Sequence, residues 1–450
     1  MKQSELLATG SLAAVFAMRL LGLFMIYPVF AGYARHLHGA TPMLIGLALG
    51  AYGLTQGLLQ IPFGLLSDRI GRKPMIAIGL VFFGIGSVVA ALSTSIGGVL
   101  LGRVLQGTGA IGSVILAFVA DLTREEVRTR AMAIVGMTIG FSFVAAIVIG
   151  PLLASIIGVS GIFWLTAVLA LVGIAITFGL VPTPARIARH RDAEAVPALF
   201  RRVLSDGELL RLDFAIFALH VILTASFLAV PGLLATSLHL TQRTDWFVYL
   251  PVLLVSVALM VPAIIVAEKG GRMKEVFIAA IALLTVSLLA LTLAGGTGAV
   301  VVAALLGFFT AFNIMEAMLP SLVTKIAPAG AKGTATGIYS SAQFMGIFVG
   351  GAGGGLAFVM AGTRGVFGLA VLFALIWLAI ASTMRRPGRY SSHLVHLTKI
   401  DRQEVSGLEA RLRAAPGVIE AVVAPDEAVA YLKIDKARFD ADAVAGIVGG

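Results

Sequence analysis

The chain has 450 residues, of which 59% are hydrophobic and 12% are charged, and its mean hydropathy is +1.00. A soluble globular chain carries about 25% charged residues, and many apolar runs here reach the ~20 residues that span a bilayer. We therefore predict a polytopic membrane protein built of helices. The sequence has no cysteine, which excludes disulfides and thiolate metal sites.

The formal charge of +10 is spread over alternate loops instead of one soluble domain, so we expect no nucleic-acid partner. One set of loops holds most of the Lys and Arg residues, and the other holds only Arg35, Arg243 and Arg364. The positive-inside rule places the first set, and both termini, in the cytoplasm. This predicts a multi-pass protein of a bacterial-type inner membrane, with its first span retained.

Twelve apolar segments are predicted to span the membrane in two lobes of six helices. The spans are 9–33, 42–66, 74–94, 97–120, 131–156, 161–181, 211–237, 246–267, 275–295, 297–323, 334–358 and 364–384. The N-terminal lobe is 1–181, the cytoplasmic central loop is 182–210, and the C-terminal lobe is 211–384. An amphipathic piece at 199–204 either lies along the inner membrane surface or belongs to a disordered linker.

After a linker at 385–390, residues 391–450 are predicted to form a small soluble domain. Strands are expected at 393–399, 418–423 and 428–434, and helices at 401–414 and 440–448. This β-α-β-β-α order resembles a ferredoxin-like domain without its final strand. The domain lacks a Cys-x-x-Cys motif, and His393 and His396 point to opposite faces of a strand, so we expect no metal. A ligand of this domain and its self-association stay open.

The loop between the second and third spans holds glycines, one acid and three basic residues in a short turn. Asp68 follows the C-terminal end of a helix, where a carboxylate is poorly placed against the helix dipole and needs another partner. The helix that begins near Thr334 offers free N–H groups at the same membrane face. We predict that Asp68 latches the two lobes together there. The alternative is a basic turn that only sets topology.

Arg72 is predicted to reach Asp121, at the end of the fourth span, and to complete a charge relay with Asp68. Gly64 would let the helices approach closely, and Gly71 would permit the tight turn. The predicted gate consists of Gly64, Asp68, Arg69, Gly71, Arg72, Lys73 and Asp121.

A weaker copy of this loop follows about 200 residues later, which indicates a duplicated bundle. The copy runs from Glu268 to Lys274. Ile264 stands where Gly64 does in the first copy, and no acid matches Asp121. We therefore predict an incomplete second latch, and the role of Glu268 and Arg272 as a gate is open.

Charged or titratable residues inside a membrane are expensive and usually functional. The candidates for proton coupling are Arg19, Arg103, His220 and Glu316. A desolvated Glu316 could exchange protons, or it could be permanently paired to a neighbouring helix. An arginine cannot release its proton but can tune a nearby acid or water. His220 is also consistent with a packing role.

A substrate cavity is predicted where polar and aromatic side chains recur every four residues. Its candidates are Tyr27, Phe30, Tyr52, Gln56, Gln60, Phe227, Asn313, Tyr339 and Gln343. This mixture suits an amphiphilic or cationic ligand better than a sugar. The alternative is hydrogen bonding between helices without substrate contact.

Three motifs carry a family resemblance. Gly64-x-x-x-Asp68-Arg69-x-Gly71-Arg72-Lys73 resembles the helix 2–3 signature of the major facilitator superfamily. Arg103-x-x-Gln106-Gly107 resembles a motif of its proton-coupled members. Gly150-Pro151 resembles the antiporter motif, and the preceding glycines, Gly136 and Gly140, fit that motif only in part. With its tail, the chain resembles the YajR-type drug/proton antiporters.

The resemblance implies alternating access of two lobes and export of amphiphilic small molecules, driven by a proton gradient and without a bound cofactor. Helix-packing roles for Gln106, Gly107, Gly150 and Pro151 come with it. Many drug/proton antiporters of this superfamily carry an acid in helix 1, where this chain has Arg19. The alternatives are a proton-coupled transporter of one metabolite and a non-pumping sensor with a ligand-binding tail. An enzyme or ATP-driven pump is disfavoured, since no Gly-x-x-x-x-Gly-Lys-[Ser/Thr] occurs.

Overall fold

A computed structural model describes residues 1–183, 195–241, 244–294, 297–386, 390–397, 404–435 and 438–449. Some residues of the sequence analysis lie outside this part of the chain. They are Arg243, most of the basic residues of the central loop, residues 387–389 of the predicted linker, the end of the predicted strand at 393–399 and the beginning of the predicted helix at 401–414.

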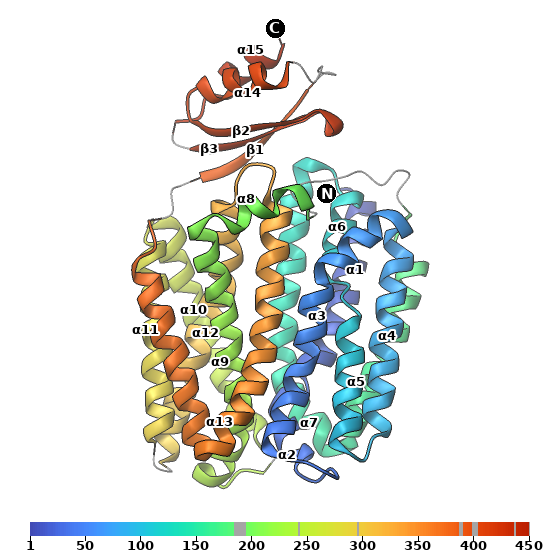
Figure 1. The fold of residues 1–450 in the computed structure, drawn as a ribbon, viewed down its shortest axis with the longest axis vertical. Helices are drawn as coiled ribbons and strands as arrows, with labels where there is room; N and C mark the ends of the chain where they lie inside the picture. The colour runs from blue at the N-terminus through green and yellow to red at the C-terminus, as the bar shows by residue number, and fades with distance from the viewer. Residues whose placement is uncertain are drawn as a thin grey trace.

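The described chain forms a helical bundle with a small domain at one end (Figure 1). The first lobe contains α1 Gln3–Phe24, α2 Tyr27–Ala34, α3 Pro42–Ile70, α4 Arg72–Leu92, α5 Ile96–Thr108, α6 Gly112–Leu122 and α7 Glu125–Gly179. A short helix, α8 Phe200–Leu204, lies in the central loop. The second lobe contains α9 Gly207–Leu238, α10 Trp246–Lys269, α11 Met273–Leu293, α12 Gly298–Ile326 and α13 Lys332–Ser382.

These helices confirm the twelve-helix bundle, although helices and crossings do not match one to one. α7 and α13 contain 55 and 51 residues, more than twice the ~20 that cross a bilayer, so each makes two crossings. Gly158 in α7 and Gly362 in α13 have φ values of +70° and +58°, which a glycine adopts without a Cβ clash. The first and fourth crossings are each divided in two, α1 with α2 and α5 with α6.

The lobes meet along α3 and the first half of α13, where glycines bring two backbones together. Gly46 lies against Gly351, and a Cβ at either position would collide with the carbonyl oxygen of the other. Gly50 and Gly53 face α13 in the same way. Small residues permit such close helix contacts inside a membrane, where packing replaces the hydrophobic effect.

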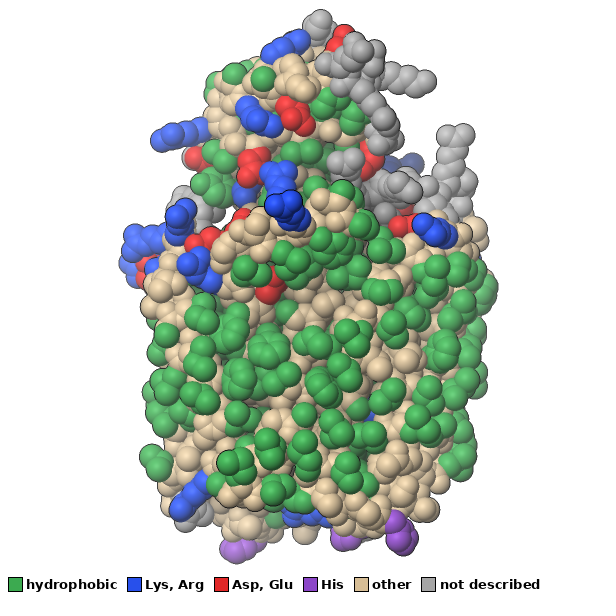
Figure 2. Space-filling view, viewed as in Figure 1, with side chains coloured by type: hydrophobic (Ala, Val, Ile, Leu, Met, Phe, Trp, Pro, Cys, Tyr) green, Lys and Arg blue, Asp and Glu red, His purple; other side chains and the backbone are tan. Residues whose placement is uncertain are grey.

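Side-chain chemistry divides the surface into a belt and two ends. Hydrophobic side chains cover the middle of the bundle, and Lys and Arg side chains gather near the small domain (Figure 2). We call the end that carries this domain the domain end, and the opposite one the far end. Both chain termini lie at the domain end (Figure 1).

The C-terminal domain contains β1 Tyr390–His396, α14 Val405–Ala414, β2 Val418–Ala424, β3 Val429–Asp435 and α15 Ala441–Gly449. Its antiparallel sheet has the strand order β1-β3-β2, and Leu432 pairs with His393 on one side and Ala421 on the other. Leu432 belongs to a small core with Leu412 and Val444. The predicted β-α-β-β-α order is confirmed, with the first strand beginning at Tyr390 and not at 393.

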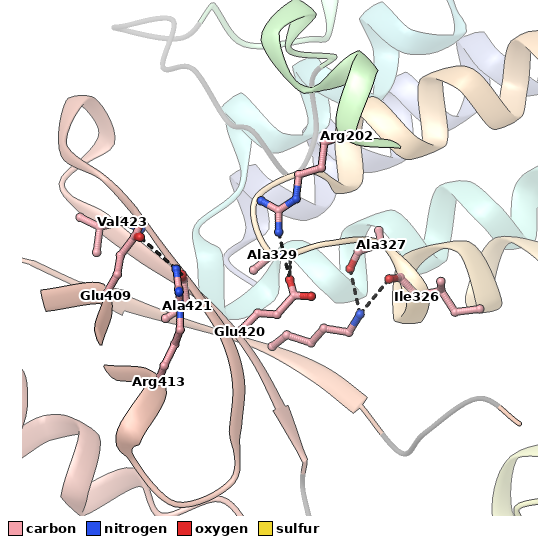
Figure 3. A network of polar contacts seen from close by, with 10 residues as sticks. Arg202, Ile326, Ala327, Ala329, Glu409, Arg413, Glu420, Ala421 and Val423 are labelled. Carbon is pink, nitrogen blue, oxygen red and sulfur yellow. Dashed lines mark hydrogen bonds and ion pairs between the residues drawn. The ribbon is translucent and has the colours of Figure 1, made fainter. Parts of the chain in front are cut away.

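The opposite face of this sheet rests on the bundle. Tyr431 packs with Ala329, in the turn between α12 and α13. Beside it, Lys433 Nζ donates to the carbonyls of Ile326 and Ala327 at 2.8 and 3.4 Å (Figure 3). Glu420 accepts from the Ala329 amide at 3.0 Å and forms an ion pair of 3.5 Å with Arg202 of α8. The amphipathic piece of the central loop is therefore helical at Phe200–Leu204 and lies at this interface.

Candidate transport site

At the domain end of the first lobe, Arg72 lies between two carboxylates. Gly71, with a φ of +103°, ends α3 and lets α4 begin at once. Arg72 Nε donates to Asp121 Oδ2 at 2.9 Å, and its Nη1 donates to Asp68 Oδ1. The Arg72 and Asp121 side chains are 1% and 0% exposed, whereas Asp68 is 22% exposed. The structure thus brings Asp68, Arg72 and Asp121 together.

The latch between Asp68 and α13 is not formed in this structure. Within the described ranges, Asp68 is held by Arg72, and no hydrogen bond joins it to α13. Gly64 faces Ser113 of α6 in its own lobe, and no described residue of α13 comes within 4 Å of a Cβ placed there. The close contacts of α3 with α13 are instead made by glycines nearer the far end, so in this conformation Gly64 packs against α6, and its role in bringing the lobes together stays a prediction.

Two other residues of the predicted gate take no part in this network. Arg69 is exposed and Lys73 is half-buried. Both side chains suit a position at the membrane surface, where basic residues gather on the cytoplasmic side.

The second copy of the loop has a simpler arrangement. Glu268 of α10 pairs with Lys325 of α12 at 2.7 Å and accepts from Ser321 at 3.1 Å. In the first lobe Arg72 bridges two acids, whereas in the second lobe Lys325 of α12 pairs directly with Glu268. Arg272 is therefore not required to hold Glu268 in place.

Two arginines are buried in the interior of the first lobe. Arg19 of α1 and Arg103 of α5 are 1% and 0% exposed. Arg19 Nη2 donates to Gln56, which donates in turn to Gln60 at 2.7 Å. Arg103 donates to Gln106 at 2.8 Å and to the Leu49 carbonyl at 3.4 Å. All these acceptors are neutral, so among the described residues neither Arg19 nor Arg103 lies beside an acid that it could tune.

Two titratable side chains, on α9 and α12, meet a glutamine of α13 in the second lobe. Gln343 Nε2 of α13 lies 2.9 Å from His220 Nε2 of α9 and 3.3 Å from Glu316 Oε1 of α12. Glu316 Oε2 lies 4.0 Å from the His220 ring nitrogen and has no hydrogen-bond partner among the described residues. His220 is 2% exposed, whereas the Glu316 side chain is 25% exposed, although its Oε2 atom is buried.

Asp213 is a residue that the sequence analysis missed. It lies on α9, seven residues before His220 and therefore on the same helix face. It is 9% exposed, and its Oδ2 has no partner in the described part of the chain. Asp213 lies two residues inside a predicted span, where an acid is common at the end of a helix, so its position alone did not indicate a function. Its seven-residue spacing from His220 was the signal that would have placed the two side chains on one helix face.

Two aromatic pairs that include residues of the predicted cavity are packed at the lobe interface. The Tyr27 and Phe227 rings are 5.6 Å apart, and those of Tyr52 and Phe344 are 6.2 Å apart, each pair joining the two lobes. Asn313 donates to Ser256 at 2.8 Å, within the second lobe. The buried candidates are Tyr27, Phe30, Tyr52, Gln56, Gln60, Phe227, Asn313 and Tyr339. A cavity of about 200 Å³ lies elsewhere, at the far end, between Arg35, Pro42, Leu228 and Phe358.

Three of the helix-packing residues make close contacts between helices. Gln106 donates to Ser87 at 2.7 Å, and a Cβ at Gly107 would collide with the Tyr52 carbonyl. A Cβ at Gly150, which precedes Pro151 in α7, would collide with the carbonyl of Met25, at the break between α1 and α2.

Comparison with known proteins identifies the family of this arrangement. Residues 12–351 match the Major Facilitator Superfamily. The chain belongs to this superfamily. Residues 401–439 match the YajR YAM domain. The inner membrane transport protein YajR of Escherichia coli (strain K12) is 44% identical over 436 residues, which cover 97% of this chain and 95% of that protein.

Two further proteins are similar to parts or to the fold of this chain. Multidrug resistance protein 2 of Bacillus subtilis (strain 168) is 35% identical over 136 residues, which cover 29% of this chain and 32% of that protein. The crystal structure of the human organic anion transporter MFSD10 (TETRAN) has a TM-score of 0.63 at 19% identity, and covers 84% of this chain and 99% of that one. This second likeness shows the fold. The chain is thus a multi-pass membrane transporter and not an enzyme.

Proposed function

We propose that this protein is a proton-driven antiporter that exports amphiphilic, drug-like compounds by alternating access. The observation that carries the proposal is the Glu316–His220–Gln343 cluster of the second lobe, which joins three helices through contacts of 2.9 to 4.0 Å. A carboxyl group there, on a side chain that is 25% exposed and that contacts no Lys or Arg among the described residues, is suited to accept and release a proton. The local similarity to a multidrug resistance protein supports the substrate class.

The orientation that we propose has the domain end in the cytoplasm of an inner membrane, with both termini there. The gathering of Lys and Arg at this end supports it (Figure 2). In this orientation, the cavity at the far end opens toward the outside.

Alternating access requires two arrangements of the same lobes. Here the glycine contacts of α3 with α13 hold the lobes together near the far end, and Asp68 is free of α13. In the other arrangement, we propose, Asp68 moves onto the N-terminal amides of α13 and closes the domain end. Glu316 would then exchange its proton with the outside.

The test uses the full chain in liposomes with an acidic lumen, so that proton exit drives substrate entry. Two dyes with the same xanthene ring system are the probes, sulforhodamine B with net negative charge and rhodamine 6G with positive charge. We expect gradient-driven uptake of at least one dye, and its loss in Glu316→Gln. Glu275→Gln is the matched control, because Glu275 is an exposed carboxylate paired with Arg386 at the membrane surface. Uptake by Glu316→Gln that keeps its dependence on the pH gradient would refute the role of Glu316.

A further inference from the structure

The two buried arginines of the first lobe lack a counter-charge. Neither Arg19 nor Arg103 contacts a carboxylate in the described part of the chain. Arg19 Nε and Nη1 and Arg103 Nε have no hydrogen-bond partner among the described residues. Removing a charged group from water costs several kcal/mol unless an opposite charge compensates it. A protein that keeps two such groups in its interior is expected to use them.

The unpartnered donors converge on one aromatic ring. The guanidinium carbons of Arg19 and Arg103 lie 5.7 and 5.1 Å from the centroid of the Tyr52 ring. The hydroxyl group of Tyr52 is also buried without a partner among the described residues. Four donor atoms on three side chains are therefore available in one region.

This region borders the interface at which the lobes must part. Tyr52 faces Phe344 of α13 and Tyr27 faces Phe227 of α9, so rings of the second lobe cover it. Separation of the lobes would expose the cationic groups together with an aromatic wall. The acids of the second lobe, Glu316 and Asp213, lie on the other side of this interface.

We propose that Arg19 and Arg103 bind the head group of an amphiphilic organic anion, and that the rings around them hold its apolar body. This inference rests on the proposed function and names the substrate class, which is anionic and not cationic as the cavity composition first suggested. Guanidinium groups form strong charge-assisted hydrogen bonds with carboxylate, sulfonate and phosphate oxygens. The first lobe would then bind the anion, and the second lobe would bind the proton.

The two dyes in proteoliposomes test this directly. We expect uptake of sulforhodamine B, and a loss of at least about tenfold in Arg19→Gln and in Arg103→Gln, because each removes a charge-assisted contact. Arg19→Lys should retain part of the uptake. Arg364→Gln is the matched control, since it removes one positive charge from an exposed position. Uptake of rhodamine 6G alone, or sulforhodamine B uptake unchanged in both Gln variants, would overturn the proposal.

A second measurement decides the case in which neither dye moves. An uncompensated buried charge opposes folding, so Arg19→Gln should raise the melting temperature of the protein purified without ligand by about 2 °C or more. A lower melting temperature would show that Arg19 is structural and would overturn the anion site.

The same uptake assay tests proton coupling separately from the anion site. Sulforhodamine B uptake that does not depend on the pH gradient would refute proton-driven antiport and support the anion site. Gradient-driven uptake of rhodamine 6G alone would support proton-driven antiport and refute the anion site.

Discussion

The ammonium group of Lys433 donates to the carbonyl of Ile326, 2.8 Å away, so the C-terminal domain caps the last turn of α12. The last carbonyls of a helix lack partners in their own helix, and a cation there also meets the negative end of the helix dipole. Burial lowers the pKa of Lys433 below its usual range. The neighbouring Glu420 opposes this shift and itself accepts from Ala329, in the middle of the turn. One strand pair thus holds the beginning and the middle of the α12–α13 turn.

Lys433→Met should therefore loosen the domain from the bundle. A hydrogen bond to a charged group contributes about 1.5–3 kcal/mol, so docking should weaken at least about tenfold. Hydrogen exchange of the Ala329 amide, or the rate of proteolysis in the 385–390 linker, would report it. Arg413→Met is the control, because Arg413 pairs with Glu409 within the domain. Equal protection in both variants would show that apolar contacts of Tyr431 suffice for docking.

Asp68 and Asp121 should respond differently to the same substitution. Asp121 is fully buried against Arg72, and breaking a buried ion pair costs about 3–5 kcal/mol, so Asp121→Asn should clearly lower the melting temperature. Asp68 is partly exposed, and Asp68→Asn should cost about 1 kcal/mol or less while it reduces dye uptake. Melting curves and uptake on the same preparations separate the two effects. Full uptake by a stable Asp68→Asn would remove Asp68 from the gate.

Asp213→Asn should slow uptake without preventing folding, if Asp213 passes protons between the domain end and the His220 face of α9. We expect a reduction of about tenfold, smaller than the loss in Glu316→Gln, because water can substitute for an intermediate carrier. The initial rate of uptake at two pH values measures it. Because no described side chain hydrogen-bonds its free Oδ2, loss of the charge should leave the melting temperature unchanged or higher. A large decrease would identify Asp213 as structural.

The sequence was sufficient for the features that follow from local spacing. Hydropathy predicted twelve crossings, because span length is set by bilayer thickness. The meeting of Arg72 with Asp68 was predictable, since the two residues lie four apart on either side of the tight turn at Gly71. The contact between Arg19 and Gln56 was not, because periodicity identifies a buried face but not the neighbouring helix. Docking through Glu420 and Lys433 was equally hidden, because charged residues on a strand look like an ordinary solvated face.

Gly46→Ala should weaken the closure of the far end. The added Cβ would collide with the backbone carbonyl of Gly351, which has no side chain that could move aside. Overpacking of this kind costs about 1–3 kcal/mol, and here it opposes only the conformation in which the lobes touch. Labelling of a single cysteine introduced at Thr41 would report greater access in the variant. Gly97→Ala is the control, because a Cβ at Gly97 has no described atom within 4 Å.

The stability of the far end should depend on pH through Asp245, which precedes α10. Asp245 is 2% exposed, one of its oxygens has no hydrogen-bond partner among the described residues, and burial raises its pKa from 3.8 to about 6. The folded protein therefore keeps this proton up to about pH 6, whereas the unfolded chain releases it near pH 3.8. Below pH 3.8 the group has no net effect on stability, and the cost grows as the pH rises to about 6.

Asp245→Asn, which is neutral at every pH, should remove this cost. We expect the variant to melt at a higher temperature than the wild type at pH 7.5, by about 2–4 °C, and the difference to shrink at pH 5. Melting of both proteins in the same detergent at the two pH values makes the comparison. Glu275→Gln is the control, because its exposed carboxylate should not shift the pH dependence. A variant that melts lower than the wild type at pH 7.5 would mean that the charged form of Asp245 stabilises the fold.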